Sequence, residues 1–146
     1  MTNGTEPRSM TDRFREMFEA LSREGEPALP RLRELYHERL QFQDPIQAVH
    51  GCDAYIEATR RLLHRGKSLS FNLGTVVEQN GNLFAVWTMT FEPKMGPAMA
   101  FQGVTHATFR EGRIVYRRDY WDLLSSAAEA LPAVGAVYRM LVGLFV

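Results

Sequence analysis

Charged and aromatic side chains alternate along the segment from Gly112 to Asp122, which holds the chain's best candidates for chemistry. The segment follows a Glu-Gly turn signal, and its aromatic and β-branched content predicts a strand of about ten residues. Because successive side chains of a strand point to opposite faces, Arg117, Asp119 and Trp121 share one face. Charged side chains are seldom fully buried without partners, so this face either lines a cavity or carries ion pairs at the strand's ends.

A second carboxylate, Asp44, precedes Pro45 at the end of a short alternating segment. Proline cannot donate to a sheet ladder, so it ends that strand and leaves Asp44 at a turn. Burial raises the pKa of a carboxyl group and suits it to proton transfer near neutral pH. The hypothesis is that Asp44 or Asp119 moves a proton at a carbon next to a ligand carbonyl. The alternatives are a turn role for Asp44, and for Asp119 an ion pair with Arg117 or Arg118.

Two further polar residues, Gln102 and His106, face the same way on a predicted strand and are candidates to hold the ligand's oxygen. The four histidines show no metal-ligand spacing, and the chain has no Gly-rich phosphate loop, nucleophile elbow or zinc motif. We therefore expect no metal and no cofactor.

Length and composition indicate one ordinary globular domain. The chain has 146 residues, of which 45% are hydrophobic and 23% are charged. Because 17 basic residues balance 17 acidic ones, no global field favours nucleic acid. The single cysteine, Cys52, excludes an intrachain disulfide and fits a cytoplasmic protein. Residues 1–8 lack the apolar core of a signal peptide and are predicted to form a disordered arm.

The last segment, 126–146, is rich in apolar residues but is interrupted by Glu129, Pro132 and Arg139. A membrane-spanning helix needs roughly 20 mostly uninterrupted apolar residues, so we predict no span. We expect instead an apolar helix that packs on the domain or on a dimer partner.

Hydrophobic periodicity predicts helices before a sheet. Amphipathic helices are expected over 11–23, 27–36 and 53–64, a short strand over 39–44, strands over 69–79, 83–92 and 98–110, and a closing helix over 123–144, bent at Pro132. Asn80-Gly81 is a strong signal for a tight hairpin. Residues 9–125 are therefore expected to form an α+β domain, in which three N-terminal helices cover a curved antiparallel sheet. Such a cone-shaped half-barrel leaves a pocket between its layers.

Three signatures, in their order and spacing, resemble the nuclear-transport-factor-like superfamily in its SnoaL-like branch. They are Phe42-Gln43-Asp44-Pro45, His50-Gly51 ahead of the third helix, and Gly112-Arg113-Ile114 through Arg118-Asp119-Tyr120-Trp121-Asp122. The resemblance covers the chain from the first helix to Trp121-Asp122. It implies a cone-shaped α+β barrel whose mouth holds a small hydrophobic ligand, and a homodimer through the outer face of the sheet. The family includes ketosteroid isomerases, polyketide cyclases, epoxide hydrolases, dehydratases and many non-enzymes.

Carried over residue by residue, the resemblance places Asp44 where ketosteroid isomerases have their proton-shuttling base. Their oxyanion donors correspond to Phe14, which cannot donate a hydrogen bond, and to Gln102. The arginine and aspartate on the middle strand of the epoxide hydrolases correspond to Thr88 and Thr90. Steroid isomerisation and epoxide hydrolysis are therefore both disfavoured.

Asp119 resembles the acid/base aspartate shared by those hydrolases and by polyketide cyclases. Three functions stay open: a cofactor-independent isomerase or cyclase, a non-catalytic ligand-binding or dimerisation module of the same fold, and an accessory protein whose apolar C-terminus meets a partner. An enzyme needs a carboxylate that faces an enclosed space with a raised pKa, whereas a binding module permits carboxylates tied up in ion pairs. The predicted site has Asp44 and Asp119 as catalytic groups, and as ligand-binding residues Phe14, Gln102, His106, Arg117 and Trp121.

Overall fold

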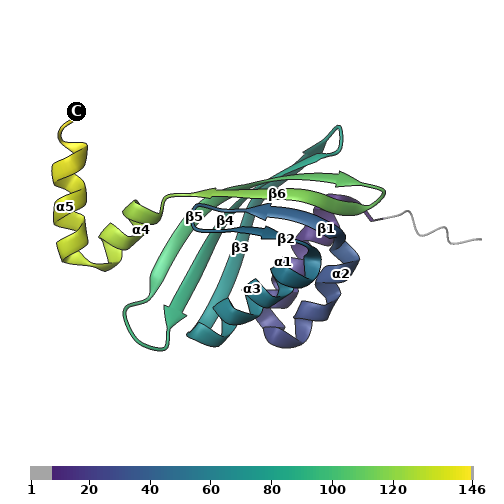
Figure 1. Ribbon diagram of the computed structural model, residues 1–146, viewed down its shortest axis with the longest axis horizontal. Helices are drawn as coiled ribbons and strands as arrows, with labels where there is room; N and C mark the ends of the chain where they lie inside the picture. The colour runs from purple at the N-terminus through teal and green to yellow at the C-terminus, as the bar shows by residue number, and fades with distance from the viewer. Residues whose placement is uncertain (1–7, 146) are drawn as a thin grey trace, which may run out of the picture.

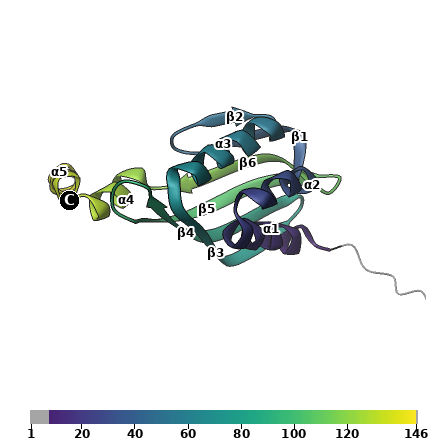
Figure 2. The same cartoon turned by 90° about the horizontal axis from the view of Figure 1, so that it is seen from below.

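The computed structural model describes residues 8–145, in which helices lie against one side of a curved six-stranded sheet (Figures 1 and 2). The predicted α+β half-barrel is thereby confirmed. Apart from Arg8, the predicted disordered arm lies outside the described residues. The elements are α1 (Met10–Glu24), the 3-10 helix η1 (Glu26–Arg31), α2 (Leu32–Leu35), β1 (Tyr36–Gln43), β2 (Ala48–His50), α3 (Cys52–Arg65), β3 (Gly66–Gln79), β4 (Asn82–Pro93), β5 (Met99–Arg110), β6 (Arg113–Trp121), α4 (Leu123–Ala130) and α5 (Pro132–Val142).

The sheet has the order β2-β1-β6-β5-β4-β3 and is mixed, not purely antiparallel as predicted. β1 pairs parallel with β6, which sets Phe42 opposite Arg117 and Gln43 opposite Arg118. A hairpin forces antiparallel pairing, but the long connection from β1 to β6 permits the parallel arrangement. This pairing brings the end of β1, followed directly by Asp44, beside the middle of β6.

Several elements differ from the predicted ones for local reasons. The second helix splits into η1 and the single turn α2, and Tyr36 begins β1 instead of ending a helix. The three-residue strand β2 falls in a segment predicted as a loop, where Val49 pairs with Phe42. The closing helix is broken at Leu131, not merely bent, because Pro132 supplies no N–H group to continue the first helix.

A bulge in β6 changes the face of one residue. Thr108 pairs with Tyr116 while Phe109 pairs with Ile114, so Val115 is an extra residue in the ladder. Ile114 is fully buried as a result, although strict alternation predicts that it points away from Arg117. Both side chains lie on the helix-covered face.

Helix α1 covers that face because its apolar side chains recur every three or four residues. Ser9 caps its first turn, with Oγ accepting from the Asp12 N–H group at 3.1 Å. Gly25 ends the helix at φ 67°, a conformation that favours glycine. The buried side chains of α1 are Met10, Phe14, Met17, Phe18, Ala20 and Leu21.

The outer face of the sheet carries exposed apolar side chains. They are Val77, Phe84, Val86, Val104 and Tyr120. The homodimer implied by the resemblance stays a prediction, and this is the face that it would cover. Helix α5 packs on α4 and stands away from the sheet and from the first three helices (Figure 1). No helix within residues 8–145 combines the length and the apolar character that crossing a membrane requires.

Candidate ligand-binding site

A cavity of about 320 Å³ lies between the concave face of the sheet and helices α1 and α3. That volume is at the lower end of the range that holds small organic ligands. Its aromatic lining comes from Phe14, Phe18, Phe42, Tyr55, Phe71, Trp87, Phe91, Phe101 and Trp121. The closed end consists of the buried Arg117 and the buried lining residues that surround it, which are Phe14, Phe18, Phe42, Tyr55 and Asp119. The mouth, defined by its exposed side chains, consists of Ile46, Gln47, Arg61, Arg65 and Leu123.

Arg117 and Asp119 form a bidentate ion pair on the cavity face of β6. Arg117 Nε donates to Asp119 Oδ1 at 2.9 Å, and Nη2 donates to Oδ2 at 2.7 Å. The two residues are only 3% and 8% exposed. Asp119 therefore pairs with Arg117, not with Arg118, and the predicted grouping of Arg117, Asp119 and Trp121 on one cavity-lining face is observed.

The rest of the Arg117 guanidinium is enclosed by aromatic residues. Nη1 donates to the hydroxyl oxygens of Tyr36, at 2.7 Å, and Tyr55, at 2.8 Å. The guanidinium carbon lies 4.9 Å from the ring centroid of Phe18 and 5.6 Å from that of Phe14, within reach of cation–π attraction. Most of the N–H groups of Arg117 thus have partners within the protein.

Burial has opposite consequences for the ionisable groups of this cluster. Burial raises the pKa of the Tyr36 and Tyr55 hydroxyls, so both stay neutral at ordinary pH. Burial is the largest single influence and acts to lower the pKa of Arg117, but the interactions with Asp119, Tyr36 and Tyr55 together outweigh it and raise that pKa well above its usual value. The arginine is therefore permanently charged and needs the carboxylate beside it.

Thr105 and Trp87 extend the network from the neighbouring strands. The fully buried Thr105 hydroxyl donates to Asp119 Oδ1 at 2.6 Å and accepts from Trp87 Nε1 at 3.0 Å. The Trp87 ring lies against Gly103, where a Cβ atom would come within 2.4 Å of the indole. The absence of a side chain at Gly103 therefore lets Trp87 reach Thr105.

Asp44 lines the cavity beyond the end of β1 and holds the β1–β2 turn. Its Oδ1 accepts from the backbone N–H groups of Ile46, at 2.8 Å, and Gln47, at 2.9 Å. Its Oδ2 accepts from the Gln47 side-chain amide at 3.3 Å. The predicted turn role of Asp44 is thus observed, and both of its oxygens are engaged.

Gln102 and His106 do not line the cavity, contrary to expectation. Side chains on β5 alternate, and the set that faces the cavity includes Met99 and Phe101, so Gln102 and His106 point to the outer face. There the His106 ring stacks on Phe84 with 4.7 Å between centroids. Neither residue can hold the oxygen of a ligand in this cavity.

The middle strand β4 follows the same rule. Thr88 and Thr90 lie on the outer face, and the residues that line the cavity from this strand are Trp87, Met89 and Phe91. The positions compared with the epoxide hydrolases' charged pair are therefore not the inward ones. No residue of β4 that lines the cavity is charged.

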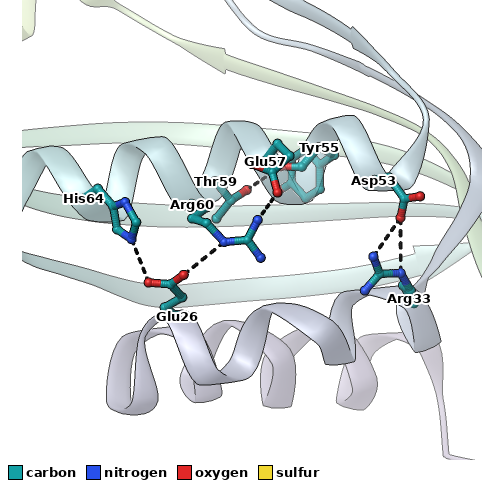
Figure 3. A network of polar contacts seen from close by, with 8 residues as sticks. All are labelled: Glu26, Arg33, Asp53, Tyr55, Glu57, Thr59, Arg60 and His64. Carbon is teal, nitrogen blue, oxygen red and sulfur yellow. Dashed lines mark hydrogen bonds and ion pairs between the residues drawn. The ribbon is translucent and has the colours of Figure 1, made fainter.

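Helix α3 is anchored by polar contacts on the side turned towards η1 and α2 (Figure 3). Glu26 accepts from Arg60 Nε at 3.0 Å and lies 2.7 Å from His64 Nε2, while Arg60 also contacts Glu57. The hydrogen bond to His64 lowers the pKa of Glu26. At the start of the helix, Arg33 donates to Asp53, at 2.9 Å for the shorter of two bonds. These contacts fix the rotation of α3 and hence which side chains reach the cavity.

Arg61 and Arg65, at the mouth, are site residues that sequence reasoning missed. One sequence feature could have identified them: Arg61 and Arg65 are four residues apart and flank Leu62, so they lie at the edge of the helix's apolar stripe. Tyr36, Tyr55 and Trp87, whose polar atoms join the Arg117–Asp119 network, were also not among the predicted site residues. Within residues 8–145, no three His, Cys, Asp or Glu side chains come together as a metal site would require.

Solved structures with TM-scores of 0.64 to 0.70 include proteins of several activities. One is an NTF2-like protein of unknown function from Exiguobacterium sp. 255-15, 22% identical, with a TM-score of 0.66 over 79% of this chain and 99% of that chain. Another is an LEH-like epoxide hydrolase of M. tuberculosis, 15% identical, with a TM-score of 0.70 over 89% and 95% of the two chains. A putative SnoaL-like polyketide cyclase from Jannaschia sp. CCS1 is 17% identical, with a TM-score of 0.64 over 87% and 97%.

At these identities the likeness concerns the fold alone. No curated protein is significantly similar to the chain in sequence. The family model described as the SnoaL-like domain matches residues 11–117, which include Arg117 of the ion pair but not Asp119, and the covering helices from residue 11 to the end of α3. That match spans well over half of the sequence, and the chain therefore belongs to the SnoaL-like domain family.

Proposed function

We propose that the protein is a non-catalytic module that binds a small, largely apolar molecule in the cavity between sheet and helices. The lining supports this function, because aromatic, leucine and methionine side chains make up most of it. Such a surface favours an apolar ligand by removing apolar area from water on both partners. The observation that carries the choice between binding and catalysis is the bidentate ion pair of Arg117 and Asp119.

A general base must take a proton from the ligand, and both carboxylates of the lining are already engaged in hydrogen bonds within the protein. Asp119 accepts two hydrogen bonds from Arg117 and one from Thr105, and it is the counter-ion of that buried arginine. Protonating it would leave a permanently charged arginine without its counter-ion in a buried site. Asp44 likewise uses both oxygens to hold its own turn. Carboxylates engaged in this way suit a binding module.

A second candidate is an isomerase-like or cyclase-like enzyme that uses Asp119 as acid and base. One observation favours it: Asp119 lines the cavity, and its Oδ2 accepts only the bond from Arg117, which leaves a lone pair for a ligand. Two of the similar structures are named as enzymes, an epoxide hydrolase and a putative polyketide cyclase, so the fold is compatible with catalysis.

Binding is tested with N-phenyl-1-naphthylamine, a neutral dye that fluoresces in apolar surroundings. Ala58 lines the cavity from α3, so we expect Ala58→Trp to fill the space and weaken dye binding at least 10-fold. Ala54→Trp, an identical change at an exposed position of the same helix, should leave the dye affinity within 2-fold. Equal affinities for the two variants would place the dye outside the cavity and contradict the proposal.

Catalysis is tested with 2-tetralone, a bicyclic ketone whose protons next to the carbonyl exchange with D₂O. A binding module should leave the exchange rate, followed by NMR, at its value in buffer. Acceleration by the unmodified protein that disappears in Ala58→Trp would support the second candidate instead.

A further inference from the structure

Two pairs of basic residues on α3 differ in whether they have acidic partners. Arg60 and His64 both contact Glu26 on the side turned towards η1 (Figure 3). Arg61 and Arg65 are each one residue further along and lie at the cavity mouth. Among residues 8–145, no carboxylate comes within 4.0 Å of either guanidinium. The chain thus neutralises one basic pair and leaves the other open.

The open pair is arranged to act together. Side chains four residues apart lie on the same side of a helix, so Arg61 and Arg65 stand next to each other over the mouth. Two like charges in this arrangement repel each other, and a bound anion would remove that cost. A further exposed cation is near, because the Lys94 backbone N–H donates to the Arg65 carbonyl at 3.1 Å.

The charge at the mouth is not cancelled from within the cavity. The Arg117–Asp119 pair at the inner side is neutral as a unit. Asp44 is the remaining acid in the lining, and its charge is partly offset by the N–H groups of its turn. The lining therefore has an excess of positive charge, and all of that excess lies at the mouth.

We propose that the ligand is an amphipathic anion, with an apolar body in the aromatic cavity and one carboxylate, sulfonate or phosphate group held by Arg61 and Arg65 at the mouth. Arginine suits this role because its planar guanidinium donates two parallel hydrogen bonds to such groups. The inference rests on the proposed binding function and adds the ligand's charge and orientation to it.

The test compares two probes with the same ring system. 1-Anilinonaphthalene-8-sulfonate carries a sulfonate, whereas N-phenyl-1-naphthylamine is neutral. In the double variant Arg61→Gln/Arg65→Gln, we expect the affinity for the sulfonate probe to fall about 10-fold and that for the neutral probe to change less than 2-fold. Raising the salt concentration should likewise lower the affinity for the sulfonate probe but not that for the neutral probe, since salt screens exposed charges.

Arg110→Gln is the matched control, because this exposed arginine lies at the β5–β6 hairpin, at the opposite end of β5 from Met99 in the cavity. It should change neither affinity. Ala58→Trp should also abolish binding of the sulfonate probe. If this variant still bound the probe, the probe would lie outside the cavity and the inference would be overturned. If the neutral probe binds in the cavity while the double variant leaves the sulfonate affinity unchanged, the inference alone fails. If neither probe binds, the proposed function fails with it.

Discussion

The closed end of the cavity and its mouth both contain arginine beside apolar side chains, yet the two regions treat that charge differently. Arg117 is 3% exposed and has a carboxylate, two tyrosine hydroxyls and several aromatic rings around it. Arg61 and Arg65 are exposed, and no acidic partner is found for them in the described part of the chain. Desolvation explains why only the buried arginine has partners. A charge removed from water must be paired and hydrogen-bonded, whereas a hydrated charge need not be.

This comparison separates structural charge from charge available to a ligand. The polar groups at the closed end mostly hydrogen-bond to one another, so we expect that end to contribute to the stability of the fold. The arginines at the mouth contribute little to packing and remain free to bind. Three predictions test this division of roles.

The largest effect is expected when the closed-end arginine is removed. Arg117→Leu leaves Asp119 buried without a counter-ion and should lower the free energy of unfolding by about 3–5 kcal/mol. Arg61→Leu, the same change at the mouth, should alter it by no more than about 0.5 kcal/mol. Urea unfolding followed by tryptophan fluorescence measures both values.

The double variant Arg117→Leu/Asp119→Leu sharpens the result. Removing both charges together should recover most of the stability lost in Arg117→Leu, because apolar side chains can replace a buried ion pair at little cost. Similar losses for Arg117→Leu and Arg61→Leu would show that the two ends do not differ as argued.

A smaller effect is expected from Gly103→Ala, beside the Trp87 ring that lines the cavity. The new Cβ would meet the Trp87 ring, whose displacement breaks its bond to Thr105, so stability should fall by about 1–3 kcal/mol. The neutral dye should bind more weakly in the same variant, because the indole moves within the lining. Gly74→Ala is the control, since the nearest atom to its Cβ would be 3.5 Å away. If Gly103→Ala changed neither the stability nor the dye affinity, the observed position of the Trp87 ring would not be required for either.

The smallest effect is a pH dependence of the closed end. Burial raises the folded-state pKa of Tyr36 and Tyr55, so their contribution to stability is complete below the ordinary tyrosine pKa of about 10. As the pH rises above that value, ionisation in the unfolded chain removes up to about 1.4 kcal/mol per pH unit for each tyrosine. Urea unfolding between pH 9 and pH 11 should therefore show a shallower decline for Tyr55→Phe than for the unmodified protein. Parallel declines would argue against a neutral, buried Tyr55.

Much of this architecture is readable from local patterns. Alternation along β6 groups Arg117, Asp119 and Trp121 correctly, and Asp44-Pro45 correctly marks a turn at a strand end. These features depend on residues within a few positions of one another, where backbone geometry dictates which way side chains point.

Other features of the site depended on which face met the helices. Alternation divides β5 into two sets but does not say which set is covered, and the set with Gln102 and His106 was assigned to the cavity wrongly. One bulged residue, Val115, likewise moved Ile114 into the core. A single choice of face or one extra residue reverses the environment of every side chain beyond it.

By itself the sequence determined most of the helices and strands and the kinds of side chain available, because these follow from short-range periodicity and turn chemistry. Only the tertiary structure decided what each charge would meet. Arg117 finds Tyr36, 81 residues away, and Tyr55, 62 residues away, whereas Arg61 and Arg65 are left open by the rotation of α3 that Glu26 helps to fix. These three residues are all arginines, yet their roles differ because burial and interaction partners are properties of the folded chain, not of the residue type.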